Sequence, residues 1–169
     1  MELKDAIFGR ASVRQFTDEA LSDEQVERLL RAAMAAPSAG NQQPWSFYVV
    51  RDAVLRGQLA AASPYAKAAA EAPVVVVACS SATRARFPQN VPQDMGAAVE
   101  NLLLAAVDEG LGAVWLGIAP EPDRMAGVAE ALALPKDVEP FALVAVGHPA
   151  GAPNPQGATR YNAGRVTWL

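Results

Sequence analysis

A short segment near the start of the chain, residues 10–16 with the sequence RASVRQF, alternates polar and apolar residues. Successive side chains of an extended strand point to opposite faces, so Arg10, Ser12 and Arg14 would share one face. Two guanidinium groups with a hydroxyl between them suit a phosphate, because arginine forms bidentate charge-assisted hydrogen bonds with oxyanions. A solvated strand face is the alternative, since arginines four residues apart also occur on ordinary surfaces. The segment therefore indicates either an anion site or an exposed strand.

The remaining inventory of catalytic side chains is small. Cys79 is the single cysteine and His148 the single histidine, so the chain forms neither an internal disulfide nor a histidine-rich metal site. It also contains no P-loop and no Gly-x-Gly-x-x-Gly fingerprint after a predicted strand. An enzyme with so few acids, bases and nucleophiles relies on a cofactor for its chemistry. We therefore expect no metal site and no catalytic side chain that reacts directly.

Length and composition predict one globular domain over residues 1–169. Because 51% of the residues are hydrophobic, a chain of this length can bury a substantial core without disulfides. The net charge of -4 argues against a nucleic acid or an anionic membrane as partner, which leaves small molecules. The longest aliphatic run, Val74–Ala78, is far shorter than the ~20 residues of a membrane-spanning helix, and the first residues do not resemble a signal peptide. These features predict a cytoplasmic protein.

The spacing of apolar residues predicts alternating helices and strands. Helical periodicity and capping signals predict helices over Ser22–Ala36, Ala53–Ala62, Gln93–Gly110 and Pro122–Leu132. Apolar and β-branched runs predict strands at Ser46–Val50, Val74–Ala78, Ala113–Leu116 and Phe141–Val146. The unbroken apolar strand Val74–Ala78 indicates burial on both faces of a sheet.

Two irregular segments stand out from these elements. Residues Ser80–Pro92 show no periodicity and are predicted to form a long surface loop, a candidate lid over a site. The tail after His148 is also irregular and ends in the strand-like residues Arg165–Leu169. Such a strand either wraps a partner subunit as an arm or returns to its own sheet.

Five motifs, taken in order, resemble the nitroreductase family of FMN-dependent oxidoreductases. They are RASVRQF at 10–16, APSAGNQQPW at 36–45, QDMGAA at 93–98 followed by ENLLLAA at 100–106, GLGAVWLG at 110–117, and GHP at 147–149. The resemblance implies an α+β, three-layer fold with a central, mainly antiparallel sheet flanked by helices. It further implies a homodimer with a C-terminal arm and with FMN bound at the subunit interface.

The resemblance also implies which residues bind the cofactor. Arg10, Ser12 and Arg14 would contact the phosphate, the ribityl chain and the pyrimidine edge of FMN, with Arg14 supporting the negative charge of the reduced flavin. A basic residue of the tail would bind the phosphate, and Arg160 fits this role better than Arg165. The partner subunit would add Pro37, Ser38, Asn41 and Gln43. Backbone near the flavin N5 would come from Leu116 and Gly117, where the missing Cβ of the glycine permits close approach.

The family's activity implies a ping-pong reaction. NADPH or NADH would deliver hydride to the flavin N5, and a nitroaromatic, a quinone or an activated alkene would then be reduced. Two alternatives stay open: a protein that binds flavin or another phosphorylated ligand without turnover of NAD(P)H, and a divergent reaction such as reductive dehalogenation.

Several other conspicuous residues are predicted to be structural. Trp45 and Trp115 are expected in the core, Asp94 at a helix cap and Asn101 in a core hydrogen bond. Cys79 is expected to be a small buried hydrophobic residue.

Overall fold

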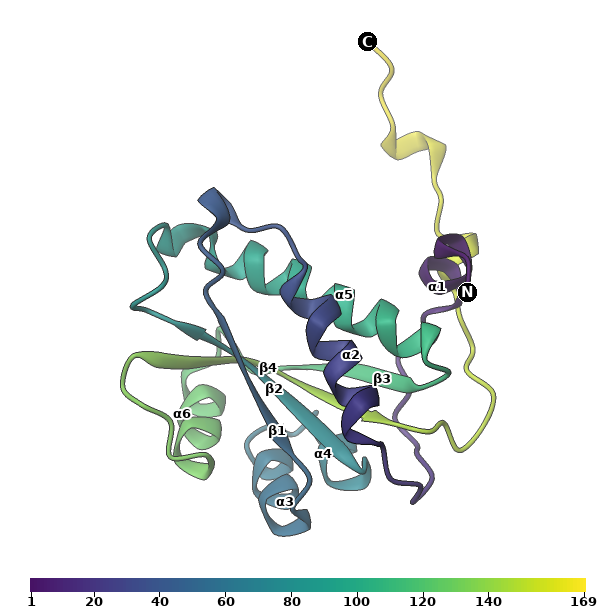
Figure 1. Ribbon diagram of the computed structural model, residues 1–169. Helices are drawn as coiled ribbons and strands as arrows, with labels where there is room; N and C mark the ends of the chain where they lie inside the picture. The colour runs from purple at the N-terminus through teal and green to yellow at the C-terminus, as the bar shows by residue number, and fades with distance from the viewer.

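The computed structural model describes all 169 residues and places one antiparallel sheet between two layers of helices (Figure 1). The strand order is β1-β2-β4-β3, with β1 at Trp45–Val50, β2 at Val74–Ser81, β4 at Val138–Gly147 and β3 at Gly112–Gly117. Each neighbouring pair of strands is antiparallel. The predicted α+β fold with a central antiparallel sheet is therefore confirmed.

Helices cover both faces of this sheet (Figure 1). One face carries α2 (Asp23–Met34) and α5 (Val91–Asp108), and the other carries α3 (Ala53–Ala61), α4 (Ala68–Glu71) and α6 (Pro122–Ala131). The short α1 (Leu3–Gly9) packs against α5. No helix combines the length and the hydropathy that crossing a membrane would require.

The predicted capping box at the start of α2 is present. The Ser22 hydroxyl accepts from the Gln25 backbone N–H at 3.2 Å, and the Gln25 side chain accepts from the Ser22 N–H at 2.9 Å. These bonds satisfy two backbone groups that a helix otherwise leaves unpaired. The helix ends at Met34, two residues before the predicted end, because Pro37 forbids continuation.

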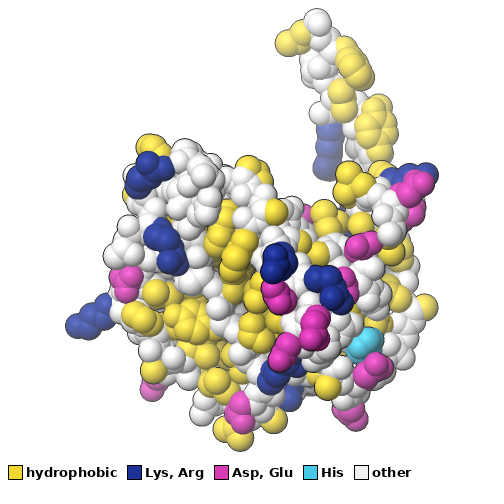
Figure 2. All heavy atoms as spheres, in the orientation of Figure 1, with side chains coloured by type: hydrophobic (Ala, Val, Ile, Leu, Met, Phe, Trp, Pro, Cys, Tyr) yellow, Lys and Arg dark blue, Asp and Glu magenta, His cyan; other side chains and the backbone are white.

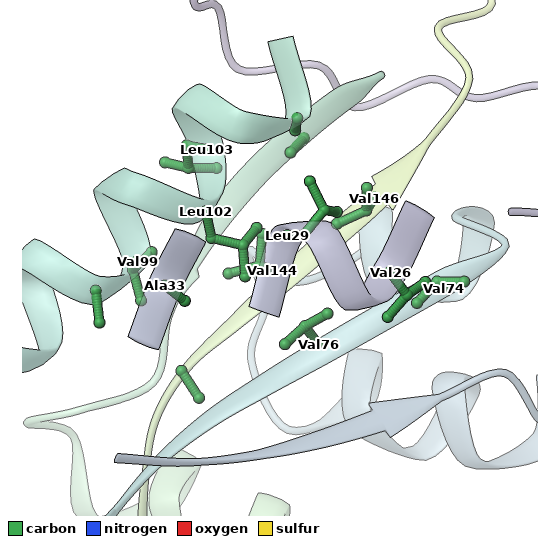
Figure 3. Packing of buried hydrophobic residues seen from close by; sticks show 14 of the residues in the cluster. Val26, Leu29, Ala33, Val74, Val76, Val99, Leu102, Leu103, Val144 and Val146 are labelled. Carbon is green, nitrogen blue, oxygen red and sulfur yellow. The ribbon is translucent and has the colours of Figure 1, made fainter. Parts of the chain in front are cut away.

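The core between α2, α5 and the sheet is built from interlocking aliphatic side chains (Figure 3). Leu29 of α2 and Leu102 of α5 point toward Val76 of β2 and Val144 of β4, and all four are fully buried. The opposite residues of β2, which include Val75 and Val77, face the second core under α3, α4 and α6. Burial on both faces therefore explains the unbroken apolar sequence of this strand, as predicted.

Cys79 belongs to the second core. Its side chain is fully buried, and burial raises the pKa of the thiol to about 12. The prediction of a small buried hydrophobic residue is confirmed, because the thiolate that reacts is disfavoured at this position.

The predicted strand at the C-terminus is wrong. The tail forms short 3₁₀ turns at Gly157–Thr159 and Ala163–Arg165 and contains no strand. It extends away from the body of the molecule and carries exposed apolar side chains (Figures 1 and 2). A strand needs a neighbour for its backbone hydrogen bonds, and no segment of this chain lies beside residues 166–169. A return of the tail to its own sheet is therefore excluded, whereas the arm toward a partner stays a prediction.

The predicted loop Ser80–Pro92 is shorter than expected. Ser80 and Ser81 extend β2, and α5 already begins at Val91, with Pro92 in its first turn. Proline fits the first turn of a helix because the backbone N–H that it lacks would be unpaired there. The remaining loop, residues 82–90, contains a 3₁₀ turn at Pro88–Asn90.

Candidate functional site

The segment 10–16 is extended, as predicted, and lies along the outer edge of β3. Ser12 forms a parallel bridge with Ala113, and the Val13 N–H donates to the Ala113 carbonyl at 3.0 Å. Gly112 allows this close approach, since a Cβ at its position would lie only 2.7 Å from Cγ1 of Val13. The first residues of the tail hold the other end, where Thr17 N–H donates to the His148 carbonyl at 2.9 Å. The edge strand β3 and the tail thus fix the arginine-bearing segment.

A cavity of about 570 Å³ opens between this segment and the tail. The predicted residues Arg10, Ser12, Arg14 and Arg160 all line it, together with residues 151–154 of the tail. Arg165, the alternative to Arg160, does not line the cavity. Residues separated by about 150 positions in sequence therefore meet at one place, as the predicted phosphate site requires.

The cavity carries an excess of positive charge. Arg10 is 3.4 Å from a carboxylate oxygen of Glu100, which is itself half exposed. Arg14 and Arg160 make no ion pair, and no acidic side chain lines the cavity. Unpaired guanidinium groups around a hollow of this size favour a phosphate or another oxyanion.

Beyond Ala113 the outer edge of β3 has no strand partner in this chain. The Ala113 carbonyl points to this edge, since it accepts from Val13. Along an antiparallel strand the N–H and C=O groups of alternate residues point to opposite sides. The N–H and C=O of Trp115 and Gly117 therefore face outward like those of Ala113, and the N–H and C=O of Leu116 face β4. Gly117 is exposed, and no atom would contact a Cβ at its position. Of the two predicted backbone contacts, Gly117 is thus open to a ligand, whereas Leu116 is buried.

The loop that carries Pro37, Ser38, Asn41 and Gln43 lies apart from the cavity. It contacts the first turn of α5, whereas the Arg10 side chain lies beside Glu100 further along that helix. The loop is internally bonded: Gln43 N–H donates to the Ser38 hydroxyl at 3.0 Å, and Gln43 Nε2 donates to Asn41 Oδ1 at 2.9 Å. One chain therefore does not bring these four residues to its own arginines.

A buried pair that the sequence did not single out fixes this loop. Gln42 is 6% exposed, and its Nε2 donates to Asp94 Oδ2 at 2.6 Å and to the Phe87 carbonyl at 3.2 Å. Its Oε1 accepts from the Phe87 N–H at 2.8 Å, and Asp94 also accepts from the Ala39 N–H at 2.9 Å. The prediction that Asp94 caps a helix is wrong, because both of its oxygens accept hydrogen bonds from the loop.

The same contacts join the loop to residues 82–90. Gly40 has a left-handed φ of 55°, and a Cβ there would lie 2.6 Å from the Phe87 ring. Arg86 adds a hydrogen bond to the Gly40 carbonyl. The predicted lid is thus anchored to the 37–43 loop at its Phe87 end.

The tryptophans Trp45 and Trp115 differ in their exposure to solvent. Trp45 is buried in the core, as predicted, but Trp115 is 36% exposed and its ring centroid lies 5.6 Å from that of Phe141. The prediction of a core position for Trp115 is wrong, because β3 is an edge strand. Asn101 forms the predicted core hydrogen bond, from Nδ2 to the Ala32 carbonyl at 3.0 Å.

Comparison with known families identifies this arrangement. The model of the nitroreductase family matches residues 7–66 and 58–148, a range that contains the arginine segment, the 37–43 loop and β3. The chain belongs to the nitroreductase family.

Individual nitroreductase relatives cover most of the chain. A protein of Archaeoglobus fulgidus with the provisional name NADH dehydrogenase/NAD(P)H nitroreductase is 40% identical over 85% of this chain and 83% of its own length. A crystal structure from Clostridium acetobutylicum, provisionally an NADH oxidase, superposes with a TM-score of 0.92 at 38% identity, over 96% of this chain and 98% of that one. A nitroreductase from Desulfovibrio desulfuricans, solved in complex with FMN, has a TM-score of 0.82 at 36% identity and covers 96% of both chains.

The buried carboxylate of Asp94 leads to a testable prediction. Asp94→Ala should lower the free energy of unfolding by about 1–3 kcal/mol, because it leaves the Gln42 amide and the Ala39 N–H without an acceptor. Denaturant unfolding followed by circular dichroism measures the change. Asp18→Ala, at an exposed position without a hydrogen bond, is the control and should change stability by less than about 0.5 kcal/mol. Equal stability of the two variants would show that the hydrogen bonds of Asp94 to Gln42 and Ala39 contribute nothing to stability.

Proposed function

We propose that this chain is an FMN-dependent oxidoreductase that passes hydride from NADPH or NADH to a small oxidant such as a nitroaromatic, a quinone or an activated alkene. The observation that carries the proposal is the cationic cavity of Arg10, Ser12, Arg14 and Arg160 at the edge of β3. The family assignment supports it, as does the FMN complex of the relative from Desulfovibrio desulfuricans.

The residues present fit FMN. Arg10, Ser12 and Arg160 offer cationic and hydroxyl donors to the phosphate, and two of the cavity's guanidinium groups lack a carboxylate partner. Arg14, on the same face of the segment, would stabilise negative charge at the pyrimidine edge of the reduced flavin. The outward N–H of Gly117 can donate to the ring, because Gly117 is exposed and has no neighbouring strand on this edge of β3.

The chemistry itself would come from the cofactor. FMN, when bound, supplies a centre that accepts and donates hydride. Cys79 is fully buried with a raised thiol pKa, and His148 lies beside Glu19 rather than in the cavity. The chain's own residues therefore bind and orient the cofactor and its substrates, and none of them acts as a nucleophile.

A homodimer would complete the site. Pro37, Ser38, Asn41 and Gln43 are far from the cavity of their own chain, so they would reach the FMN of a partner subunit. The C-terminal tail supports such a partner, since Trp168 is 88% exposed and the neighbouring apolar residues are exposed as well (Figure 2). Apolar surface of this kind favours coverage by another chain, and the tail would wrap the partner as an arm.

Two arginine variants test the proposed cofactor site. Arg10→Ala should weaken FMN binding by about tenfold or more, because it removes a charge-assisted contact with the phosphate. Arg14→Ala should lower the flavin reduction potential by roughly 30 mV, the equivalent of about 1.4 kcal/mol for two electrons. Fluorescence titration of the apoprotein with FMN and a dye-equilibration potential measure the two effects. Arg31→Ala on the surface of α2 is the control, and variants that match it in both measurements would remove Arg10 and Arg14 from the site.

Deletion of residues 166–169 tests the arm. The truncated protein should dissociate at a higher concentration than the full chain, because the exposed apolar end would no longer contact the partner. Sedimentation velocity over a dilution series gives the dimer dissociation constant. A replacement of Thr167 by Ser keeps the apolar residues and is the matched control. An unchanged dimer after truncation would contradict the arm, and a monomeric full chain would contradict the dimer.

A further inference from the structure

A second cationic group stands at the far end of the open edge of β3. Arg124, in the first turn of α6, donates from Nη1 to the Gly117 carbonyl at 3.4 Å. Its guanidinium carbon lies 5.3 Å from the ring centroid of Tyr65, in the range of a cation–π contact. Arg124 and Tyr65 are 59 positions apart in sequence, and their side chains meet beside Gly117, whose N–H faces outward.

The charge of Arg124 is not neutralised within the chain. Arg28, Arg31 and Arg51 each have a carboxylate oxygen within 2.8 Å, whereas Arg124 has none within 4 Å. A guanidinium group has five N–H donors, and only one of those of Arg124 is used. Asp123 and Glu121 precede it in the chain but form no ion pair with it. The group is therefore available to an anion from outside.

An apolar hollow of about 530 Å³ adjoins this end of β3. Its walls are mainly apolar and include Ala119, Met125 and Phe141, and one acidic residue, Glu139, also lines it. Arg124 stands beside the hollow, next to Met125 in sequence, and is not part of its lining. Walls of this type suit an aromatic ring, and the hollow has a volume typical of small-molecule sites. Because Glu139 disfavours an anion inside the hollow, the two features together suit a ligand whose ring enters the hollow and whose negative charge stays outside it, at Arg124.

We infer that Arg124 is a specificity residue, oriented by Tyr65, that binds the carboxylate or sulfonate of an aromatic electron acceptor. The inference rests on the proposed function, because it assumes that the flavin ring lies at the Gly117 N–H. Arg124 bonds the carbonyl of that same residue, so the anion would lie close to the reacting atoms. An acceptor such as 4-nitrobenzoate carries its carboxylate on the same ring as the nitro group that is reduced. The end of NAD(P)H that donates hydride carries an uncharged carboxamide, and its phosphates lie further along the molecule.

The test is a binding measurement on the FMN-loaded, oxidised protein with two probes that it cannot reduce. Benzoate and benzamide have the same shape and differ in charge, and their dissociation constants are measured from the change in flavin absorbance. Arg124→Gln should weaken benzoate binding by about tenfold and change benzamide binding by less than about twofold. Arg31→Gln is the matched control and should leave both constants unchanged. In steady-state kinetics, Arg124→Gln should lower kcat/KM for 4-nitrobenzoate and leave that for 4-nitrobenzamide unchanged.

The other results overturn the inference in distinguishable ways. Equal weakening of both probes would mean that Arg124 only shapes the pocket. A slower reduction by NADPH with unchanged benzoate binding would assign Arg124 to the hydride donor. A wild-type protein that binds benzoate no better than benzamide also contradicts the inference. All of these leave the proposed function intact, whereas failure of the wild-type protein to bind FMN would contradict the proposed function itself.

Discussion

The open hydrogen-bonding edge of β3 is the constraint on which the site depends. Helices cover both faces of the sheet, so unpaired backbone groups occur only along its edges (Figure 1). At β3 the segment 10–16 occupies the start of the edge through Ala113 and leaves the part up to Gly117 free. The arginine cavity lies at one end of this free stretch and Arg124 at the other. A ligand that fits this edge has an anionic tail for the arginine cavity and a flat ring whose polar edge meets the free backbone up to Gly117. FMN has its phosphate and its ring in this order.

Much of the architecture follows from the sequence because it depends on local periodicity. The capping box at Ser22 and the apolar spacing of α2 and α5 are signals within one helix. The unbroken valines of β2 require burial on both faces, and the two cores provide it. The grouping of Arg10, Ser12 and Arg14 also follows from strand alternation, whereas the addition of Arg160 came from family resemblance alone.

The parts that the sequence did not predict depend on contacts between distant segments. Nothing near Gln42 indicates that its amide is shared between Asp94 and Phe87, since these partners come from α5 and from another loop. The exposure of Trp115 follows from the position of β3 at the sheet edge, which strand composition does not encode. The tail has the composition of a strand but no neighbour to pair with in its own chain. The sequence does not distinguish Arg124 from the other arginines, because its position beside Gly117 is set by the fold.

Binding of a reducible FMN at the edge of β3 is tested by the absorbance spectrum of the purified protein from 300 to 550 nm, before and after anaerobic addition of NADPH and then NADH. We expect flavin bands that bleach with at least one of the two donors, because the cavity would hold FMN and the open edge of β3 would leave its ring accessible. Flavin bands that neither donor bleaches would favour a flavin-binding protein without NAD(P)H turnover. A spectrum without flavin bands, even after incubation with FMN, would contradict FMN binding in the arginine cavity.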